Sequence, residues 1–165
     1  MIVIVMGVSG AGKSTVGAIL ADALGWDFVD ADSFHPRSNL LKMRRRIALT
    51  EKDRAPWLAS IRVQVQRWLT EYRSVVLACS ALRASHRRLL MVDPTRMRLV
   101  YLKGSVDVLQ ARLSNRPRHF MPPELLDSQL AILEEPSEAI IVDINQPPDA
   151  IVRQVREALG SPASQ

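Results

Sequence analysis

The stretch MGVSGAGKST, residues 6–15, matches the pattern G-x-x-x-x-G-K-[ST] in full. An apolar, β-branched run, Ile2–Met6, leads into it and a helical pattern follows, so the stretch connects a strand to a helix. Glycines let the backbone turn tightly and bring its N–H groups to phosphate oxygens, and the helix that begins there adds the positive end of its dipole. The sequence therefore predicts a phosphate-binding loop, with an ordinary glycine-rich turn as the alternative.

Two side chains of this loop have expected roles in binding ATP and Mg²⁺. Lys13 is expected to reach the β- and γ-phosphates, and the Ser14 hydroxyl is expected to bind Mg²⁺. The backbone of the whole loop should surround the phosphates. The predicted nucleotide-binding residues are Gly7, Val8, Ser9, Gly10, Ala11, Gly12, Lys13, Ser14 and Thr15.

The rest of the chain alternates short apolar runs with helical patterns. Further strands are expected at 27–30, 75–79, 99–102 and 140–144. Helices are expected from the loop to a stop at Gly25, at 57–72 with Pro56 near the start, at 105–113 with Ser105 as the cap, and after Pro147-Pro148. This alternation predicts an α/β protein of the P-loop NTPase type, with a five-stranded parallel sheet, helices on both faces, and ligands at the carboxyl ends of the strands.

Two irregular regions interrupt the alternation, one from Asp30 to Arg54 and one at 115–123. Long irregular pieces in a compact domain are usually lids or binding loops. We therefore expect a single kinase domain over residues 1–160, with a lid at about 115–135 and a frayed tail at 161–165.

The composition limits the classes of protein to be considered. The 165 residues are 47% hydrophobic and 24% charged, as in a folded domain, and a net charge of +5 suits an anionic ligand or nucleic acid. Cys79 is the one cysteine, so no internal disulfide or cysteine zinc site can form. The chain starts on an apolar run without a charged leader, too short for a signal or a membrane span, so a cytoplasmic protein without membrane association is expected.

Two acidic residues, Asp30 and Asp32, follow the second expected strand. ATPases and GTPases usually carry an apolar strand that ends in a magnesium-binding aspartate, but the strand at 75–79 runs into Ser80 instead. In an extended segment the two acids would point to different faces, so Asp30 could join Ser14 at the metal while Asp32 faces an acceptor hydroxyl. This arrangement is typical of a small-molecule kinase, whereas a turn aspartate and a helix cap are the alternative.

Seven segments of the chain are distinctive as a set. They are MGVSGAGKST, DADSFHPRSNLLKM, LTEKDRAPWL, CSALRASHRRLL, YLKG, RPRHFMPPELLDSQLAILEEP and VDINQP. Together they resemble the gluconokinases, the small ATP-dependent kinases of D-gluconate, from Ile2 to about Leu159. The resemblance implies Mg²⁺-dependent phosphorylation of the 6-hydroxyl of D-gluconate, a lid like that of nucleoside monophosphate kinases, and a homodimer.

The chain departs from the usual pattern of that family at four positions. Arg46 stands where a glycine is common, Ala48 where a proline is common, Glu51 for an aspartate and His86 for a tyrosine. The first three lie in one loop, so the departures bear on the conformation of that loop and on substrate affinity, and not on the nucleotide site.

The acceptor side of the site is expected to be built from residues that follow the second strand. Asp32 is the expected base and acceptor-positioning group. His35 is expected to hydrogen-bond a hydroxyl of the sugar acid, and a loop histidine bonded to its own backbone is the alternative. Asn39 and Lys42 lie one turn apart if their segment is helical, and could point into the same cleft.

An arginine is expected to bind the carboxylate of the substrate. Arg54 is the first choice, because a guanidinium holds a carboxylate with two parallel hydrogen bonds. An ion pair of Arg54 with Glu51 or Asp53 at a helix start is the alternative. Arg83, which follows the third strand, is the competing choice for the same carboxylate.

The lid is expected to contribute charge to the transferred phosphate. Arg116 is preferred over Arg112 and Arg118 for this role, and a lid arginine acts only when the lid is closed. His119 is a substrate residue by resemblance. The segment VDINQP is expected to be at most a wall of the adenine pocket.

Three rival functions share parts of this pattern. A kinase of another hydroxy acid, such as shikimate, would have the same loop, acids and lid. The basic charge favours a nucleic-acid-end kinase or an RNA-binding NTPase, but aromatic residues are only 5% and no stacking platform is seen, so no nucleic-acid partner is expected. A nucleotide-binding regulator without turnover is the third.

Overall fold

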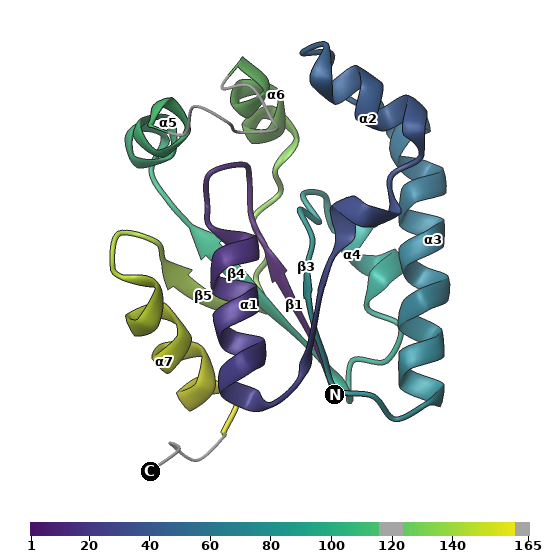
Figure 1. Cartoon of the computed structure of the whole chain (residues 1–165), viewed down its shortest axis with the longest axis vertical. Helices are drawn as coiled ribbons and strands as arrows, with labels where there is room; N and C mark the ends of the chain where they lie inside the picture. The colour runs from purple at the N-terminus through teal and green to yellow at the C-terminus, as the bar shows by residue number, and fades with distance from the viewer. Residues whose placement is uncertain (116–123, 161–165) are drawn as a thin grey trace.

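A parallel sheet forms the centre of the computed structural model, which describes residues 1–115 and 124–160. Its strands are β1 (Ile2–Met6), β2 (Asp27–Asp30), β3 (Val75–Ala78), β4 (Met97–Lys103) and β5 (Ile140–Asp143), in the order β2-β3-β1-β4-β5 (Figure 1). β1 is central, and Ile4 is paired with Leu77 on one side and Leu99 on the other. The predicted five-stranded parallel sheet is confirmed, and the loop after β1 leaves the sheet between two other strand ends.

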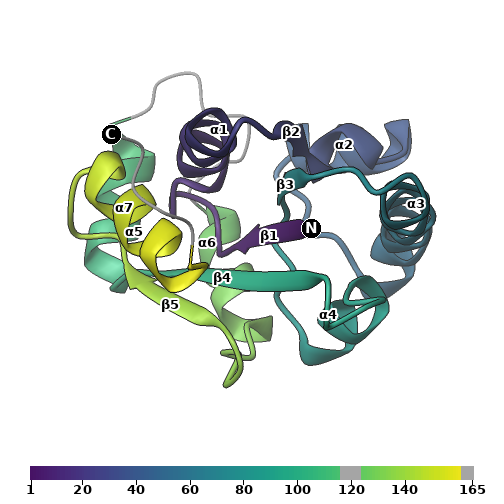
Figure 2. The same cartoon turned by 90° about the horizontal axis from the view of Figure 1, so that it is seen from below.

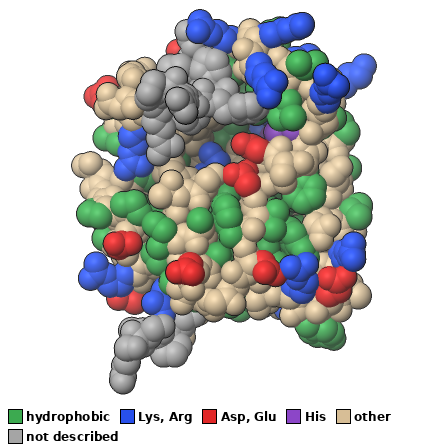
Figure 3. Space-filling model, viewed as in Figure 1, with side chains coloured by type: hydrophobic (Ala, Val, Ile, Leu, Met, Phe, Trp, Pro, Cys, Tyr) green, Lys and Arg blue, Asp and Glu red, His purple; other side chains and the backbone are tan. Residues whose placement is uncertain are grey.

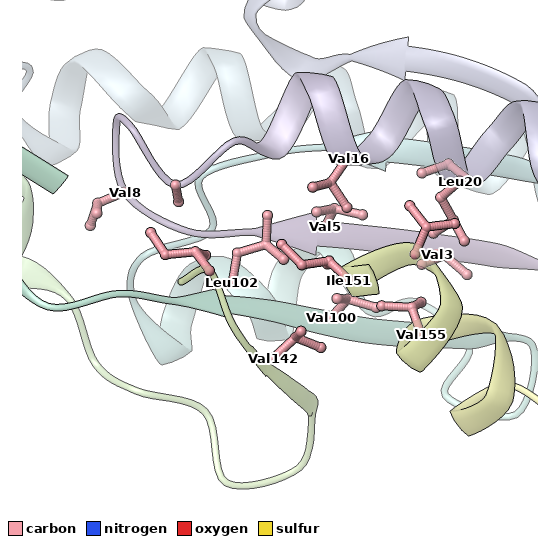
Figure 4. Packing of buried hydrophobic residues seen from close by; sticks show 14 of the residues in the cluster. Val3, Val5, Val8, Val16, Leu20, Val100, Leu102, Val142, Ile151 and Val155 are labelled. Atoms are coloured by element: carbon pink, nitrogen blue, oxygen red, sulfur yellow. The ribbon is translucent and has the colours of Figure 1, made fainter. Parts of the chain in front are cut away.

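Helices cover both faces of the sheet, as predicted (Figure 2). On one face, Val3 and Val5 pack with α1 (Lys13–Leu24), α5 (Val106–Ser114), α6 (Glu124–Ile132) and α7 (Pro148–Ala158). Figure 4 shows this cluster, in which Val16 and Leu20 of α1 and Ile151 and Val155 of α7 pack on the same face of the strands. On the other face, the intervening residues of β1 pack with α3 (Glu51–Thr70) and α4 (Ala84–Leu90). The alternation along β1 thus divides the core into two layers.

The helix α3 begins earlier than predicted. It starts at Glu51, and Pro56 lies inside it and not at its start. Thr50 caps it, because its hydroxyl accepts the N–H of Asp53 at 3.1 Å while the Asp53 carboxylate accepts the N–H of Thr50 at 2.9 Å. This reciprocal pair satisfies donors that the first turn leaves open. Together with the buried apolar residues of α3, it offsets the hydrogen bond that the proline removes.

The segment from Asp30 to Arg54 is mostly helical, which corrects the expected irregular region. Ala31–Phe34 form a 3₁₀ turn, η1, and Arg37–Arg44 form α2 before α3 begins. Arg46 follows α2 with a φ of 61°, a left-handed conformation that glycine adopts at lower cost. The arginine at this position therefore strains the loop backbone.

The remaining differences are small. β3 and β5 each end one residue earlier than predicted, at Ala78 and Asp143, and β4 is longer than predicted at both ends. The helix α4 is not predicted by the sequence. The predicted stop at Gly25 is confirmed. Residues 116–123 of the predicted lid and the predicted tail at 161–165 lie outside the described residues, and the later part of the lid forms α6. No helix in the described parts of the chain is long and apolar enough to cross a membrane.

Candidate active site

The loop after β1 curves around the side chain of Lys13. The Nζ atom of Lys13 donates to the carbonyl oxygen of Val8 at 3.1 Å. Gly12 caps α1 with a φ of 90°, and a Cβ atom on Gly10 would lie 3.3 Å from the carbonyl oxygen of Leu109. Both positions therefore require glycine, and they leave a backbone cradle at the start of α1 where phosphates can bind.

The two predicted acids stand at the edge of this loop. The Oδ2 atom of Asp30 accepts a hydrogen bond from the Ser14 hydroxyl at 2.6 Å. Its Oδ1 atom accepts the backbone N–H of Asp32 at 2.9 Å, so Asp30 is also the turn aspartate that was the alternative. The segment is not extended as expected, because Asp32 lies in the 3₁₀ turn η1. The turn, and not strand alternation, separates the two carboxylates.

A cavity with about 600 Å³ of empty space, open to solvent, lies beside the phosphate loop. It brings together Lys13, Asp32, His35 and Arg54, which the sequence predicted to act together. On the surface, acidic side chains and a histidine border a hollow, and basic side chains gather above it over α2 (Figure 3). The other lining residues are Ser9, Met43, Ile47, Ala48, Leu49, Trp57, Ser80, Leu82, Leu125, Ser128 and Gln129.

Burial and charge act in opposite directions on Lys13. Burial lowers the pKa of Lys13, while the carboxylates of Asp32 and Asp30 act to raise it. A polyphosphate in the cradle would add further negative charge near the ammonium group and favour its charged form. The site thus holds a partly buried lysine whose charged form an anionic ligand would stabilise.

His35 is a neutral, rigidly held side chain. Its ring stacks on Trp57 with centroids 4.3 Å apart and an interplanar angle of 10°. Burial, and then the charge of Arg54, lowers the pKa of His35 to about 4, against the opposing charge of Asp30. Its Nε2 atom lies 3.8 Å from Oδ1 of Asp32, so the ring edge points toward the predicted base.

Asn39 contacts the Nδ1 atom of His35, the ring nitrogen that does not face Asp32. Its Nδ2 atom lies 2.9 Å from the carbonyl oxygen of Asp53 and 3.1 Å from Nδ1 of His35. Because a carbonyl can only accept, the amide nitrogen is the donor, and Nδ1 of His35 accepts from it. The proton of the neutral ring therefore sits on Nε2, on the side of Asp32.

Asn39 and Lys42, two predicted substrate residues, are held by protein groups. Asn39 is 2% exposed, and Lys42 is ion-paired with Asp53 at 2.8 Å. Hydrogen bonds from Lys42 and Thr50 hold the pKa of Asp53 at about 2. Among the described residues that line the cavity, neither Asn39 nor Lys42 is found. They are one turn apart as predicted, but the structure favours supporting roles for both.

The two candidate arginines converge on Glu51. Arg54 lines the cavity, and its Nη1 atom lies 3.3 Å from Oε1 of Glu51. The Nε atom of Arg83 lies 3.2 Å from the same oxygen, but Arg83 is not among the described residues of the cavity wall. Arg54 thus lines the cavity, as a residue that binds the substrate carboxylate must, and it also forms the ion pair that was the alternative. The geometry favours Arg54 over Arg83.

Sequence reasoning missed the contribution of α6. Gln129 accepts the backbone N–H of Ser9 through Oε1 at 2.8 Å and donates from Nε2 to the Ser9 hydroxyl at 3.3 Å. Both residues are buried and line the cavity. Gln129 lies 120 positions after Ser9, so nothing in the sequence near the loop indicates this contact. Its place in the segment RPRHFMPPELLDSQLAILEEP, which resembles the gluconokinases, is the only sequence signal for it.

A second cavity, with about 780 Å³ of empty space, adjoins the other side of the phosphate loop. Its position next to Gly12 and Thr15 suits the nucleoside part of ATP. Gln146 supports the expectation that the VDINQP segment forms a wall. The other lining residues are Val16, Arg112, Asn115, Pro148 and Ile151.

Two predicted site residues, Arg116 and His119, lie outside the described residues. Within residues 1–115 and 124–160, no group of three His, Cys, Asp or Glu side chains could hold a metal ion. The oxygen pair of Ser14 and Asp30 suits Mg²⁺, which takes most of its other ligands from phosphates and water.

The chain is similar to known kinases over nearly its whole length. A family model described as shikimate kinase matches residues 9–160. A probable gluconokinase of Mus musculus is 42% identical over 178 residues, covering 96% of this chain and 97% of that protein. A sugar kinase structure from a Janibacter species has a TM-score of 0.90 at 40% identity, covering 96% and 94% of the two chains. A gluconokinase structure from Sinorhizobium meliloti has a TM-score of 0.85 at 42% identity, covering 96% and 90%.

Proposed function

The chain belongs to the gluconokinase family, and we propose that its acceptor cavity binds D-gluconate with the 6-hydroxyl at Asp32. The activity is the ATP-dependent phosphorylation of D-gluconate to 6-phospho-D-gluconate. One observation carries the assignment of the site, namely that Asp32 and Arg54 line a single cavity with Lys13 of the phosphate loop. A proton acceptor, a carboxylate-binding group and a phosphate-binding group therefore face the same space.

The proposed reaction is an in-line transfer. Asp32 accepts the proton of the 6-hydroxyl as its oxygen attacks the γ-phosphorus, and the bond from that phosphorus to the bridging oxygen of ADP breaks. Lys13 and the backbone N–H groups of the loop stabilise the charge on the phosphates. His35, held by Asn39, presents its Nε2 proton to a hydroxyl of the substrate. Arg116 and His119 lie outside the described residues, and the proposal keeps their predicted roles toward the transferred phosphate and the substrate.

Mg²⁺ is part of the proposal. The Ser14 hydroxyl and the Asp30 carboxylate would hold it, the latter directly or through water, because a hard cation prefers oxygen ligands. When bound, the ion neutralises negative charge on the phosphates and so helps the acceptor oxygen to approach.

A coupled assay of ADP release with D-gluconate tests the assignment. Asp32→Asn keeps the shape of the side chain but removes the proton acceptor, so we expect kcat to fall at least about 100-fold while ATP still binds. The matched control is Asp22→Asn on α1, far from the cavity, which should keep full activity. Near-normal turnover by Asp32→Asn would show that another group takes the proton.

The alternative acceptor with support from a specific observation is shikimate, since the matching family model is that of shikimate kinase. Comparing kcat/KM for the two acids at equal ATP separates the two functions. A nucleic-acid-binding function predicts oligonucleotide affinity that persists in high salt, whereas electrostatic binding falls steeply with salt. A regulator without turnover would show no ADP release above the background measured without acceptor.

A homodimer and a cytoplasmic location remain part of the proposal. The dimer rests on the resemblance to the family, and the location rests on the expectation drawn from the sequence. Sedimentation equilibrium at concentrations from nanomolar to micromolar would give the mass of the assembly, and a monomer over that whole range would contradict the dimer.

A further inference from the structure

One carboxylate, that of Glu51, contacts three nitrogen groups at the rim of the acceptor cavity. Its Oε1 atom is shared by Arg54 at 3.3 Å and Arg83 at 3.2 Å, and its Oε2 atom lies 2.9 Å from Nε2 of His86. Glu51 is the first residue of α3, and the other cluster members come from the next turn of α3 and from the start of α4. The cluster therefore joins two helices beside the cavity.

His86 fixes the position of the Glu51 carboxylate. Only 2% of the His86 side chain is exposed, and its Nδ1 atom accepts the backbone N–H of Arg83 at 3.3 Å. A neutral ring that accepts at Nδ1 carries its proton on Nε2, so it donates to Oε2 of Glu51. Although Glu51 is half exposed, one of its oxygens is thus tied to a buried ring that cannot move freely.

The charges explain why a carboxylate is needed at this point. Two guanidinium groups that approach each other repel, and Arg54 is only 12% exposed, so water screens its charge poorly. Burial and the charge of Arg83 lower the pKa of Arg54, and Glu51 opposes both. Without the carboxylate, the repulsion between the two guanidinium groups would favour a conformation in which Arg54 turns away from Arg83 and toward solvent.

We infer that Glu51 is a positioning residue that holds the Arg54 guanidinium in the acceptor cavity, where it binds the carboxylate of the substrate. The inference rests on the proposed function, because it takes Arg54 as the group that binds gluconate. Glu51 itself does not touch the substrate. With its charge counted, the two arginines and one glutamate carry a net charge of +1, which matches a monoanionic sugar acid.

The test is the variant Glu51→Gln, with steady-state kinetics in both substrates. Glutamine keeps the size of the side chain but loses the charge, so we expect the KM for D-gluconate to rise about tenfold. The KM for ATP should stay within twofold, and so should kcat. The matched control is Glu71→Gln at the end of α3, where Glu71 pairs with Arg67 on the exposed surface. This control should change neither KM.

A neutral polyol separates positioning of Arg54 from a general disturbance of the cavity. D-glucitol has the same chain length as gluconate but no carboxylate, and its inhibition constant against gluconate should be unchanged in Glu51→Gln. An equal loss of affinity for both compounds would overturn the inference, because a distorted cavity would weaken both. An unchanged KM for gluconate would overturn it as well.

A rescue experiment tests the role of His86. Glu51→Asp shortens the carboxylate side chain by one methylene and should raise the KM for gluconate. His86→Tyr extends the buried donor, so the double variant should restore the KM to within about twofold of the parent. If the double variant has an unchanged unfolding temperature but its KM stays high, the inferred link between His86 and Glu51 is contradicted.

A further variant keeps this inference distinct from the proposed function. Arg54→Met removes the guanidinium, and the proposed function predicts a rise of at least tenfold in the KM for gluconate. If Arg54→Met has that effect and Glu51→Gln has none, only the positioning role of Glu51 fails. If Arg54→Met has no effect, the proposed carboxylate site fails.

Discussion

His35 shows how one buried side chain makes stability depend on pH. The pKa of His35 is lowered from 6.5 to about 4, so the unfolded chain takes up a proton at a higher pH than the folded chain does. The stabilisation is complete above pH 6.5 and is lost as the pH falls from 6.5 to 4. It amounts to about 3 kcal/mol when 1.36 kcal/mol is counted for each pKa unit.

Urea unfolding at pH 7 and pH 4.5 measures this effect. We expect His35→Gln to flatten the pH dependence of the unfolding free energy, because glutamine takes up no proton in this range. NMR titration of the parent should place the His35 ring below pH 5. A titration midpoint near 6.5 would contradict the neutral ring that burial and the charge of Arg54 favour.

Trp57 links the core to the turn that carries Asp32. Its buried Nε1 atom donates to the carbonyl oxygen of Ala31 at 2.8 Å. Trp57→Phe keeps most of the aromatic surface but leaves that carbonyl without its partner, so we expect a loss of about 1–3 kcal/mol of stability. Because Ala31 directly precedes Asp32, kcat should fall as well.

The control for Trp57→Phe is Trp68→Phe, at an equally buried position of the same helix. It should lower the unfolding temperature through lost packing and leave kcat unchanged. Equal kinetic losses in the two variants would mean that helix stability, and not the Ala31 contact, sets the activity.

At the scale of whole elements, α6 is attached to the phosphate loop. The two hydrogen bonds of Gln129 to Ser9 hold this helix against the loop, and α6 is also the element that follows the predicted lid. Gln129→Leu removes both bonds in a buried place, so we expect kcat to fall about tenfold and the KM for ATP to rise.

The control for this prediction is Gln66→Leu, which replaces an exposed glutamine of α3 that lines neither cavity. It should leave the kinetics unchanged. Unaltered kinetics in Gln129→Leu together with a lower unfolding temperature would show that the contact only stabilises the fold.

The elements differed in how well their sequence predicted them. The strands were found because each is a short buried apolar run, and α1 because its apolar stripe starts at the loop and ends at Gly25. The sequence predicts the start of α3 too late, because Pro56 is a more conspicuous local signal than the polar capping pair of Thr50 and Asp53. α2 and α4 are short, and their sequences contain too few apolar residues to form a helical stripe.

Across the whole molecule, the parts of the site that follow a strand end were predicted, and those that depend on distant contacts were not. The loop residues, the two acids, His35 and Arg54 lie within short reach of β1, β2 or the start of α3. The pairing of Gln129 with Ser9 and that of Arg83 with Glu51 join positions far apart in the sequence. A single sequence gives the residue types at these positions, but it does not show which distant residues contact one another.

The stability of the whole molecule should report occupancy of the phosphate loop. A ligand that binds only the folded state at 100 times its Kd raises the unfolding free energy by about 2.7 kcal/mol. We expect ATP with Mg²⁺ to raise the unfolding temperature of the parent, and Lys13→Met to lose most of that rise because the ammonium group of the loop is gone. The control is Lys103→Met, since Lys103 lies at the end of β4 in an exposed ion pair with Glu135, and should keep the full shift. An undiminished ATP-dependent shift in Lys13→Met would mean that the loop backbone alone binds the phosphates, and Lys13 would then serve the transfer step and not the binding.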